Sequence, residues 1–414
     1  MRFSSCFTPF LSEIPSTFLF SDTLWYYAGK AAKKLKKVIL IPDSFKGTIT
    51  SQEVCSIMEK VIHELDTNIE TIKLPVADGG EGSVDCFLQA VGGEKQYLRV
   101  TGVFGEDFEG YYGILNGGET AVVEMAACAG LPQAEGRLNP ELATTYGVGQ
   151  LILDAADKGV KRIIVGLGGS ASNDAGCGAA AATGIAFKNA AGESFIPCGG
   201  TLKHIAEIDV SGMDKRLSGV EIITMCDIDN PMYGENGAAY VFGPQKGADA
   251  EMLVRLDNGL RHLNEVFKRD LGKDFSRLPG GGAAGAMGAG MAAFFRSRLQ
   301  MGIDTVLDTV RFSQYLKGAD MVFTGEGRID GQSIRGKVVI GVARRAAQYK
   351  LPVIAIVGDI CDGAQEAYPL GVTAMFSTNT VAGDFSRTRH RAKENLAITM
   401  GNVMRLALYR PEKG

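Results

Sequence analysis

Residues 162–178 read RIIVGLGGSASNDAGCG, a run rich in Val and Ile that passes into a glycine loop and then into an alanine-rich segment. A short continuous apolar run before a glycine turn is typical of a strand buried in a parallel sheet. The loop, and the helix that we expect after it, would turn backbone N–H groups toward an anion. This stretch therefore predicts a strand, a loop and a helix, with a ligand at the carboxyl end of the strand.

Other short apolar runs along the chain end in a carboxylate in the same way. They cover 38–41, 70–77, 222–226, 321–325 and 353–358, and the acidic residues that follow them are Asp43, Asp78, Asp227, Glu326 and Asp359. Segments with helical periodicity, at 51–65, 144–158, 174–188 and 337–349, lie between several of these runs. Alternating strands and helices predict an α/β protein with a doubly wound parallel sheet. The carboxylates would meet at one edge if the strands share a sheet.

Residues 98–123 follow a different pattern, because apolar and polar residues alternate there between glycine turns, as in antiparallel hairpins. We therefore expect a doubly wound domain built from both chain ends, 37–80 and 284–410, with a second α/β (α+β) domain of residues 81–283 inserted. We expect residues 1–36 to be a disordered extension or the product of a start assigned too early. Their apolar part precedes the basic stretch KAAKKLKK, the reverse of a secretory signal.

The composition argues against several classes of protein. The 414 residues include 54 glycines, nearly twice the usual share of about 7%, and 45% hydrophobic residues, so the chain can form a large core. A net charge of −4, from 43 basic and 47 acidic residues, argues against nucleic acid as a partner. No apolar run reaches the ~18 residues of a membrane span. The 8 cysteines form no CxxC motif, which favours reduced thiols in a cytoplasmic protein, and the 4 scattered histidines argue against a zinc site.

The segment PDSFKG (42–47) places a lysine among polar side chains directly after the first predicted strand. A small anionic substrate needs a cation for its carboxylate and acceptors for its hydroxyl groups. Lys46, with Asp43, Ser44 and Asp78, supplies that set. A structural ion pair is the alternative interpretation of such a lysine, and a turn former or helix N-cap is the usual role of a single strand-end Asp.

The glycine loop at 166–178 also satisfies G-x-G-x-x-A through Gly166, Gly168 and Ala171, a weak signal for dinucleotide binding. The second strand with an acidic end, expected about 20 residues later, is missing. Glycines that only allow close packing of helix and strand are a further interpretation. Three polar residues at the expected helix start, Ser170, Asn173 and Asp174, favour a ligand instead.

Two later loops and a lysine are further candidates for binding phosphate. Gly331, Gly336 and Lys337 come close to a Walker A motif, but Val338 stands where Ser or Thr is required, so only Lys337 stays a candidate. TGEGRID (324–330) is the better signal, and its alternative is an exposed ion-paired turn. Lys246 in GPQKGA (243–248) could bind a phosphate or lie in a solvated surface turn.

Five motifs in order carry a resemblance: PDSFKG, VADGGEG (76–82), GLGGSASNDAG (166–176), CDIDNPMYGENGAAYVFGPQKGA (226–248) and TGEGRIDGQS (324–333). From about residue 37 to near residue 410 the chain resembles the bacterial type I glycerate kinase family. The resemblance implies an enzyme that uses ATP and Mg²⁺ to phosphorylate D-glycerate, most often to 2-phosphoglycerate. It also implies a flavodoxin-like domain with a second α/β domain inserted and an active site between them. Two departures concern loop geometry: Ala175 replaces an expected glycine, and Val338-Val339 replaces a proline-containing end.

Phosphoryl transfer needs positioning and charge neutralisation, which suits glycine loops, carboxylates and a few cations. On this hypothesis Asp174 accepts the proton of the attacking hydroxyl, and Lys46 and Arg328 hold the substrate carboxylate or the phosphoryl group. The substrate would be bound by Asp43, Ser44, Asp78 and Asn173. ATP would be bound by Gly168, Gly169, Ser170, Gly325, Gly327 and Lys337. Asp227 and Glu326 would hold Mg²⁺, with Asp78 or Asp229 as substitute ligands.

Two other functions stay open at this point. One is an NAD-dependent oxidoreductase that uses the G-x-G-x-x-A loop, and the other is a non-catalytic sensor of nucleotides or sugar acids. The oligomeric state is also open, and a homo-oligomer is compatible with the sequence.

Overall fold

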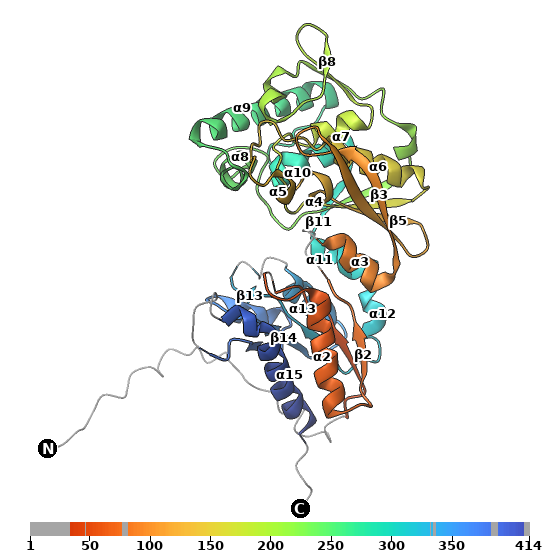
Figure 1. The fold of residues 1–414 in the computed structure, drawn as a ribbon, viewed down its shortest axis with the longest axis vertical. Coiled ribbons are helices and arrows are strands. Elements are labelled where there is room, and N and C mark those ends of the chain that lie inside the picture. The colour runs from red at the N-terminus through yellow and green to blue at the C-terminus, as the bar shows by residue number, and fades with distance from the viewer. Residues whose placement is uncertain are drawn as a thin grey trace, which may run out of the picture.

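The computed structural model describes residues 34–45, 47–76, 82–331, 333, 337–381 and 388–409. Two lobes, each built around its own sheet, lie one above the other in Figure 1. Lys46 and Asp78 lie outside the described residues. None of the described helices combines the length and the apolar character needed to cross a bilayer.

The sheet of the first lobe is formed by both ends of the chain. Its order is β2-β1-β12-β14-β16, and all its strands are parallel. The strands are β1 (Lys37–Leu40), β2 (Glu70–Lys73), β12 (Met321–Thr324), β14 (Val353–Val357) and β16 (Ala374–Ser377). A short parallel pair, β13 (Arg328–Ile329) and β15 (Asp359–Ile360), extends from the ends of β12 and β14.

Helices cover both faces of this sheet, because its central strands β1, β12 and β14 are apolar on both sides. Along β1, Val38 and Leu40 pack with the helices α2 (Ser51–Leu65) and α15 (Ala392–Leu408). Ile39 and Ile41 belong to the core on the opposite face. That face is covered by α11 (Gly302–Thr309), α12 (Phe312–Leu316), α13 (Val338–Ala347) and the 3₁₀ helix η6 (Ala364–Leu370).

The second lobe contains a mixed sheet in the order β11-β10-β6-β5-β4-β3. Its strands are β3 (Gly93–Thr101), β4 (Asp107–Leu115), β5 (Thr120–Glu124), β6 (Arg162–Gly166), β10 (Glu221–Met225) and β11 (Arg298–Gln300). The last four are parallel, and β3 and β4 form the hairpin predicted at 98–123. A small antiparallel sheet beside it contains β7 (Ala186–Lys188), β8 (Ser194–Phe195) and β9 (Glu207–Asp209).

The helical elements of this lobe are mostly short. They are α3 (Ser83–Val91), α4 (Ala126–Ala129), α5 (Leu131–Ala134), α6 (Tyr146–Asp157), α7 (Cys177–Ala182), α8 (Ala238–Phe242), α9 (Ala250–Val266) and α10 (Ala283–Phe294). Further turns are η1 (Gly199–His204), η2 (Lys215–Leu217), η3 (Pro244–Lys246) and the π-helix η4 (Phe267–Leu271), and η7 (Arg389–Arg391) precedes α15 in the first lobe.

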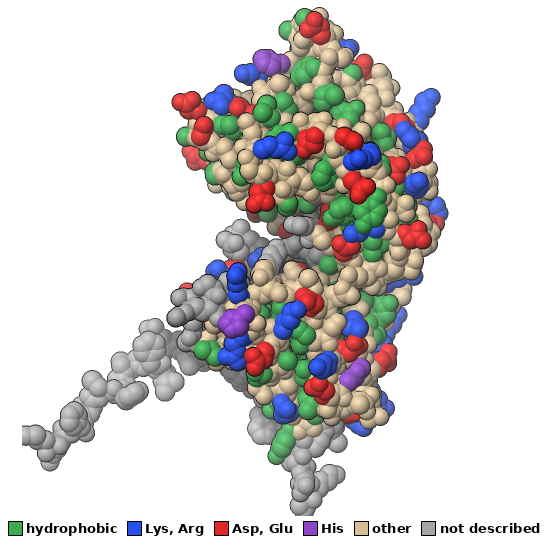
Figure 2. All heavy atoms as spheres, in the orientation of Figure 1, with side chains coloured by type: hydrophobic (Ala, Val, Ile, Leu, Met, Phe, Trp, Pro, Cys, Tyr) green, Lys and Arg blue, Asp and Glu red, His purple; other side chains and the backbone are tan. Residues whose placement is uncertain are grey.

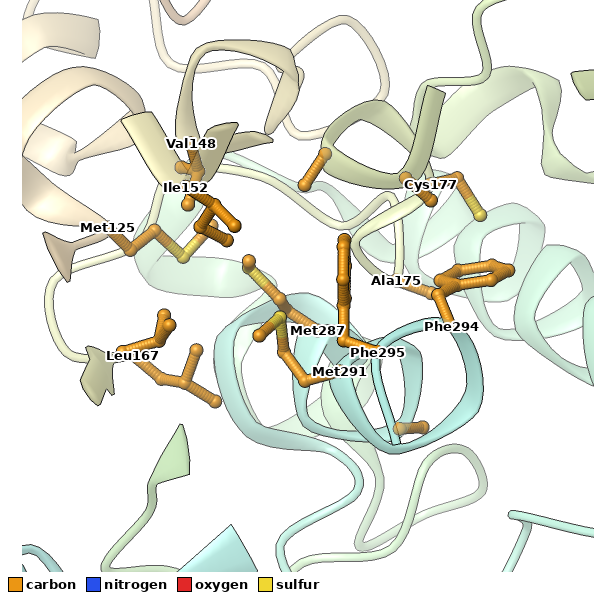
Figure 3. Close-up of a cluster of buried hydrophobic side chains, with 14 of the residues drawn as sticks. Met125, Val148, Ile152, Leu167, Ala175, Cys177, Met287, Met291, Phe294 and Phe295 are labelled. Carbon is orange, nitrogen blue, oxygen red and sulfur yellow. The ribbon is translucent and has the colours of Figure 1, made fainter. Parts of the chain in front are cut away.

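The core of the second lobe places α10 directly behind the glycine loop. Met287 and Met291 of α10 lie between Leu167, after β6, and side chains of α6, as Figure 3 shows. The opposite face of the mixed sheet packs on α3 and on α11 of the first lobe, with Val122 and Ile164 in the contact. One apolar cluster therefore joins the two lobes.

A mixed α/β fold with parallel sheets confirms the predicted class. The six predicted strands form, but they are divided between two sheets, so their carboxyl ends meet from two directions. The helix predicted over 174–188 is wrong in extent, because α7 ends at Ala182 and Ala186–Lys188 is a strand. Gly184 ends it with a φ of 94°. The domain boundaries stay a prediction, although α10, which begins at residue 283, and β11 after it pack with the second lobe.

Candidate active site

A cleft of about 1080 Å³ lies between the lobes, and Figure 2 shows the hollow at this position. Three predicted segments line it: Asp43 and Ser44 after β1, Gly168 to Ser170 after β6, and Asp227 after β10. Both sheets therefore direct the carboxyl ends of their strands at one cleft, where ligands of parallel α/β sheets bind. This arrangement brings most of the predicted site together although the strands do not share a sheet.

A smaller cavity of about 270 Å³ lies at the carboxyl edge of the first sheet. It is lined by Glu326, Gly327, Arg328 and Lys337, all predicted, and by Asp359, Thr378, Asn379 and Arg389 among others. Asp43, Ser44, Phe45 and Thr48 line this cavity and the cleft alike. The segment 43–48, as far as the structure describes it, is the wall that the two cavities share.

The shared wall is held in place by backbone hydrogen bonds. Asp43 N donates to Gly325 O at 2.8 Å, which ties the end of β1 to the end of β12. Phe45 N donates to Ile49 O at 2.8 Å, and Gly47 makes the turn between them with a φ of 80°. Asp43 is 5% exposed, and its Oδ1 accepts a hydrogen bond from Ser44 N at 2.6 Å. Gly325 allows the close approach, because a Cβ there would lie 2.1 Å from Ile356 O.

Asp174 does not lie at the surface of the cleft. It is 0% exposed, and its Oδ2 accepts hydrogen bonds from Thr145 N (2.9 Å), Thr145 Oγ1 (2.7 Å) and Gly178 N (3.2 Å). Its Oδ1 accepts from Gly176 N at 3.1 Å. Burial raises the pKa of this carboxyl, and these hydrogen bonds oppose the rise. Asp174 therefore lies just before α7, whose N-cap is Gly176, and its carboxylate already accepts hydrogen bonds from the N–H groups at the start of that helix.

The loop before Asp174 packs against the backbone of α10. Ala175 has a φ of 51°, the left-handed conformation that a glycine would adopt with less strain, and its N–H donates to Gly285 O at 3.0 Å. A Cβ at Gly285 would lie 2.1 Å from Ser172 O, so α10 needs a glycine here. The small residues of α10 therefore allow its backbone to lie directly against the loop.

Asn173, predicted to bind the substrate, is also fully buried and does not line the cleft. Both atoms of its side-chain amide lack a hydrogen-bond partner among the residues that the structure describes, as does Ser172 Oγ beside it. Buried amides normally have partners, so this pair marks an unsatisfied polar site directly behind the glycine loop.

Lys246 is the strongest signal that the sequence left undecided. It closes η3, lines the cleft, and is only 2% exposed, so the surface-turn alternative is wrong. Its Nζ donates to Ser170 Oγ at 2.7 Å and to Ser172 O at 2.6 Å. Burial lowers the pKa of Lys246 to about 7, and the charge of Asp174 opposes that shift. A buried amine that can carry a positive charge therefore lies at the glycine loop.

The remaining charged candidates divide between the two cavities. Asp227 lines the cleft, and its Oδ1 accepts from Gly302 N, at the start of α11, at 2.6 Å. Arg328 is 63% exposed and pairs with Asp330 (Nε to Oδ2, 3.2 Å), as in the exposed ion-paired turn that is the alternative interpretation of TGEGRID. Glu326 is 5% exposed in the small cavity. Within the described part of the chain, no three His, Cys, Asp or Glu side chains gather as a metal site.

Sequence reasoning missed the polar residues that follow β16. Thr378 and Asn379 line the small cavity, and Asn379 Nδ2 donates to Asp359 Oδ1. The run AMFS is a short strand whose end carries a hydroxyl and an amide where the other strands carry a carboxylate. A search for any polar residue after an apolar run would have found them.

The G-x-G-x-x-A loop is not part of a dinucleotide-binding unit. After α7 the chain enters β7, which pairs antiparallel with β8 and β9 in a separate sheet. A dinucleotide unit continues instead with a parallel strand beside the first. The topology therefore argues against the oxidoreductase alternative.

Known proteins share both the sequence and the fold. The model of the glycerate kinase family matches residues 38–408. A glycerate kinase of Bacillus cereus is 42% identical over 368 residues, which are 89% of this chain and 97% of the relative. The glycerate 2-kinase of Escherichia coli K12 is 41% identical over 369 residues, again 89% and 97%. The crystal structure of a candidate glycerate kinase 2 from Salmonella typhimurium LT2 aligns with a TM-score of 0.80 at 41% identity, over 89% of this chain and 97% of that chain. This chain belongs to the glycerate kinase family.

Proposed function

We propose that this chain is an ATP-dependent kinase that phosphorylates D-glycerate and releases 2-phosphoglycerate. The observation that carries the proposal is the wall shared by two cavities, which Asp43, Ser44, Phe45 and Thr48 line on both sides. Transfer of a group between two small molecules requires both to reach one point in a fixed orientation. Membership of the glycerate kinase family supports the choice of substrates.

The sizes of the cavities suggest which substrate each one takes. The cleft of about 1080 Å³ has room for a nucleotide and includes the glycine loop, whose backbone N–H groups suit phosphate. The cavity of about 270 Å³ suits a three-carbon acid. Arg328 would face its carboxylate, and so would Lys337, which the sequence analysis assigned to ATP. Asp359 and Asn379 would face its hydroxyl groups.

We assign the orientation of the attacking hydroxyl to Asp43, which lies on the shared wall, and give Asp174 a positioning role. Asp174 fixes the glycine loop through Thr145, Gly176 and Gly178. Lys46 and Asp78 keep their proposed roles in substrate binding, because Lys46 is next to Phe45 in the sequence and Asp78 comes two residues after Val76, which lines the cleft.

Mg²⁺ is proposed as the ion that neutralises phosphate charge when ATP is bound. Such an ion usually takes one or two carboxylates and completes its shell with phosphate oxygens and water. Asp43 and Asp227 both line the cleft, so its donor set fits this requirement. Asp227 and Glu326 keep their proposed ligand roles, with Asp78 or Asp229 as substitutes. Removal of divalent ions with EDTA should abolish turnover, and added Mg²⁺ should restore it.

We further propose that the first lobe is a flavodoxin-like unit. In chain order its strands run 2-1-3-4-5 across the sheet, the order of that fold, with helices on both faces. A cytoplasmic location is also proposed, on the ground that seven described cysteines are all unpaired.

A glycerate-dependent assay of ADP release, with phosphorus NMR of the product, tests the function. We expect ADP and 2-phosphoglycerate in equal amounts. Binding of ATP and glycerate without turnover would favour a sensor, and turnover with another hydroxy acid but not with glycerate would reject the assigned substrate.

A further inference from the structure

The side chain of Lys246 is a buried amine whose hydrogen-bond acceptors are uncharged. It reaches the cleft from η3 and donates to the hydroxyl of Ser170 and to the carbonyl of Ser172. Among the described residues no carboxylate accepts a hydrogen bond from its Nζ. A charged group buried in this way is costly unless a counter-charge is supplied. An ammonium group has three donors, so one remains for a ligand in the cleft.

The groups around Lys246 are also donors. Gly168 and Gly169 line the cleft, and in the part of the chain that the structure describes neither backbone N–H has an acceptor. The loop that carries them is fixed, because Leu131 N donates to Gly169 O at 2.8 Å and Ala171 N to Ala129 O at 3.0 Å. An ammonium group, a hydroxyl and two N–H groups on a rigid loop form a site for an oxyanion.

We propose that Lys246, with the N–H groups of Gly168 and Gly169 and the hydroxyl of Ser170, binds the phosphate oxygens of the nucleotide. This inference rests on the proposed function and names the residue that receives the nucleotide's charge. The carboxylate of glycerate is the less suitable ligand, because the small cavity has cations of its own in Arg328 and Lys337. The Lys246 site lies in the larger cleft, which has the room for a nucleotide that the small cavity lacks.

A phosphate at this site supplies the missing counter-charge, and this has a consequence that can be measured. Burial lowers the pKa of Lys246 to about 7 in the ligand-free protein, and Asp174 is the charged group that acts against this shift. An anion beside the amine raises the pKa again. Above pH 7, binding of the nucleotide is therefore accompanied by uptake of a proton by Lys246.

The test compares wild type with Lys246→Met, Lys246→Arg and Lys203→Met, a matched control at an exposed lysine that lines neither cavity. MgATP is titrated at pH 8 by calorimetry in buffers of different ionisation enthalpy. Wild type and the control should take up a proton. Lys246→Met should bind ATP about 10- to 100-fold more weakly, without proton uptake. Lys246→Arg should recover part of the affinity, also without uptake, because arginine stays charged.

The ligand of Lys246 is identified by which binding affinities the Lys246→Met variant loses. We expect Lys246→Met to leave the affinity for adenosine, which carries no phosphate, and the KM for glycerate within about twofold, and thermal unfolding to show that the variant is folded. Equal ATP affinity in wild type and Lys246→Met would overturn the proposal, and so would a loss confined to glycerate. Should wild type bind ATP through Lys246 but fail to phosphorylate glycerate, the proposed function would fall while this site would stand.

Discussion

At the scale of single residues, Asp174 and Lys246 are both buried near the glycine loop, and their hydrogen bonds give them different roles. Asp174 accepts four hydrogen bonds, three of them from backbone N–H groups, so it holds the chain. Lys246 donates to two neutral acceptors and lines the cleft. The carboxylate has its partners within the fold, whereas the cation still lacks a charged one.

Replacing Asp174 and Asp43 by Asn should separate a structural effect from a catalytic one. Asp174→Asn would turn an NH₂ group toward N–H donors, so the free energy of unfolding should fall by about 1–3 kcal/mol for each unsatisfied group. Asp43→Asn should lower kcat by about 10²–10⁴ with a smaller loss of stability. Urea unfolding and initial rates on the folded fraction measure the two effects. The opposite pattern would return the proton-accepting role to Asp174.

Replacing Lys246 by Met should change how stability depends on pH. The pKa of Lys246 is lowered by burial to about 7 in the folded chain, against about 10.4 for an ordinary lysine. Between these values the unfolded chain binds the extra proton, so the free energy of unfolding of wild type rises with pH, by at most about 1.4 kcal/mol per unit. Wild type should therefore gain stability relative to Lys246→Met from pH 7 to pH 9 in urea unfolding. Parallel curves would show that the buried amine stays charged without a ligand.

The sequence could predict which segments carry the site but not which side chains reach the cleft. GLGGSASNDAG contains three polar candidates, and only the structure separates Ser170, at the cleft, from the buried Asn173 and Asp174. That separation depends on α10, which comes more than 100 residues later and packs against the loop. The sequence does not decide the place of Lys246 for the same reason, because its burial depends on contacts with a distant loop.

At the scale of elements, α10 shows why glycines crowd this region. Ala284, Gly285 and Ala286 have φ values of 54°, 67° and 67°, which interrupt the helix where it meets the loop. Gly290 lies on the next turns of α10, and a Cβ there would be 1.9 Å from Ala175 O. The loop and the helix are therefore in backbone contact, and small residues at these positions are a condition of the site's geometry.

A methyl group at Gly290 should push α10 away from the glycine loop. We expect Gly290→Ala to lower the free energy of unfolding by about 3 kcal/mol or more, since overpacking against a backbone carbonyl cannot be relieved by a rotamer change. Gly331→Ala is the control, because the nearest atom to its new Cβ is 4.0 Å away. Chemical denaturation of both variants measures the difference. Equal stability would mean that the contact can relax without cost.

Single strands and helices were easier to predict than the neighbouring strands with which each one pairs. The strand β1 and the helix α2 could be predicted because their apolar periods and, for α2, the Thr50 capping box are local signals. The division of the strands into two sheets could not, since β6 and β14 have the same buried, Val- and Ile-rich pattern and nothing local assigns them to different sheets.

At the scale of the whole molecule, the site exists only where the lobes meet. Lys246 and the glycine loop come from the second lobe, and Asp43 and Ser44 from the first, yet all of them line one cleft. The apolar cluster that packs α3 and α11 against the mixed sheet holds the lobes together behind it. The cleft and the small cavity share the wall formed by Asp43, Ser44, Phe45 and Thr48, so substitutions in the two cavities should have separable effects on the two substrates.

Three substitutions test this arrangement of the substrates. Asn379 lines only the small cavity, so Asn379→Leu should raise the KM for glycerate about tenfold or more and leave that for ATP near wild type. Gln245 lines only the cleft, so Gln245→Phe should raise the KM for ATP alone. Ser44 lines both, and Ser44→Leu should raise both constants and lower kcat, because the bulk stands between the reacting groups. Initial rates over a grid of the two substrate concentrations measure all three variants. If Asn379→Leu raised the KM for ATP and Gln245→Phe raised the KM for glycerate, each substrate would have to be assigned to the other cavity.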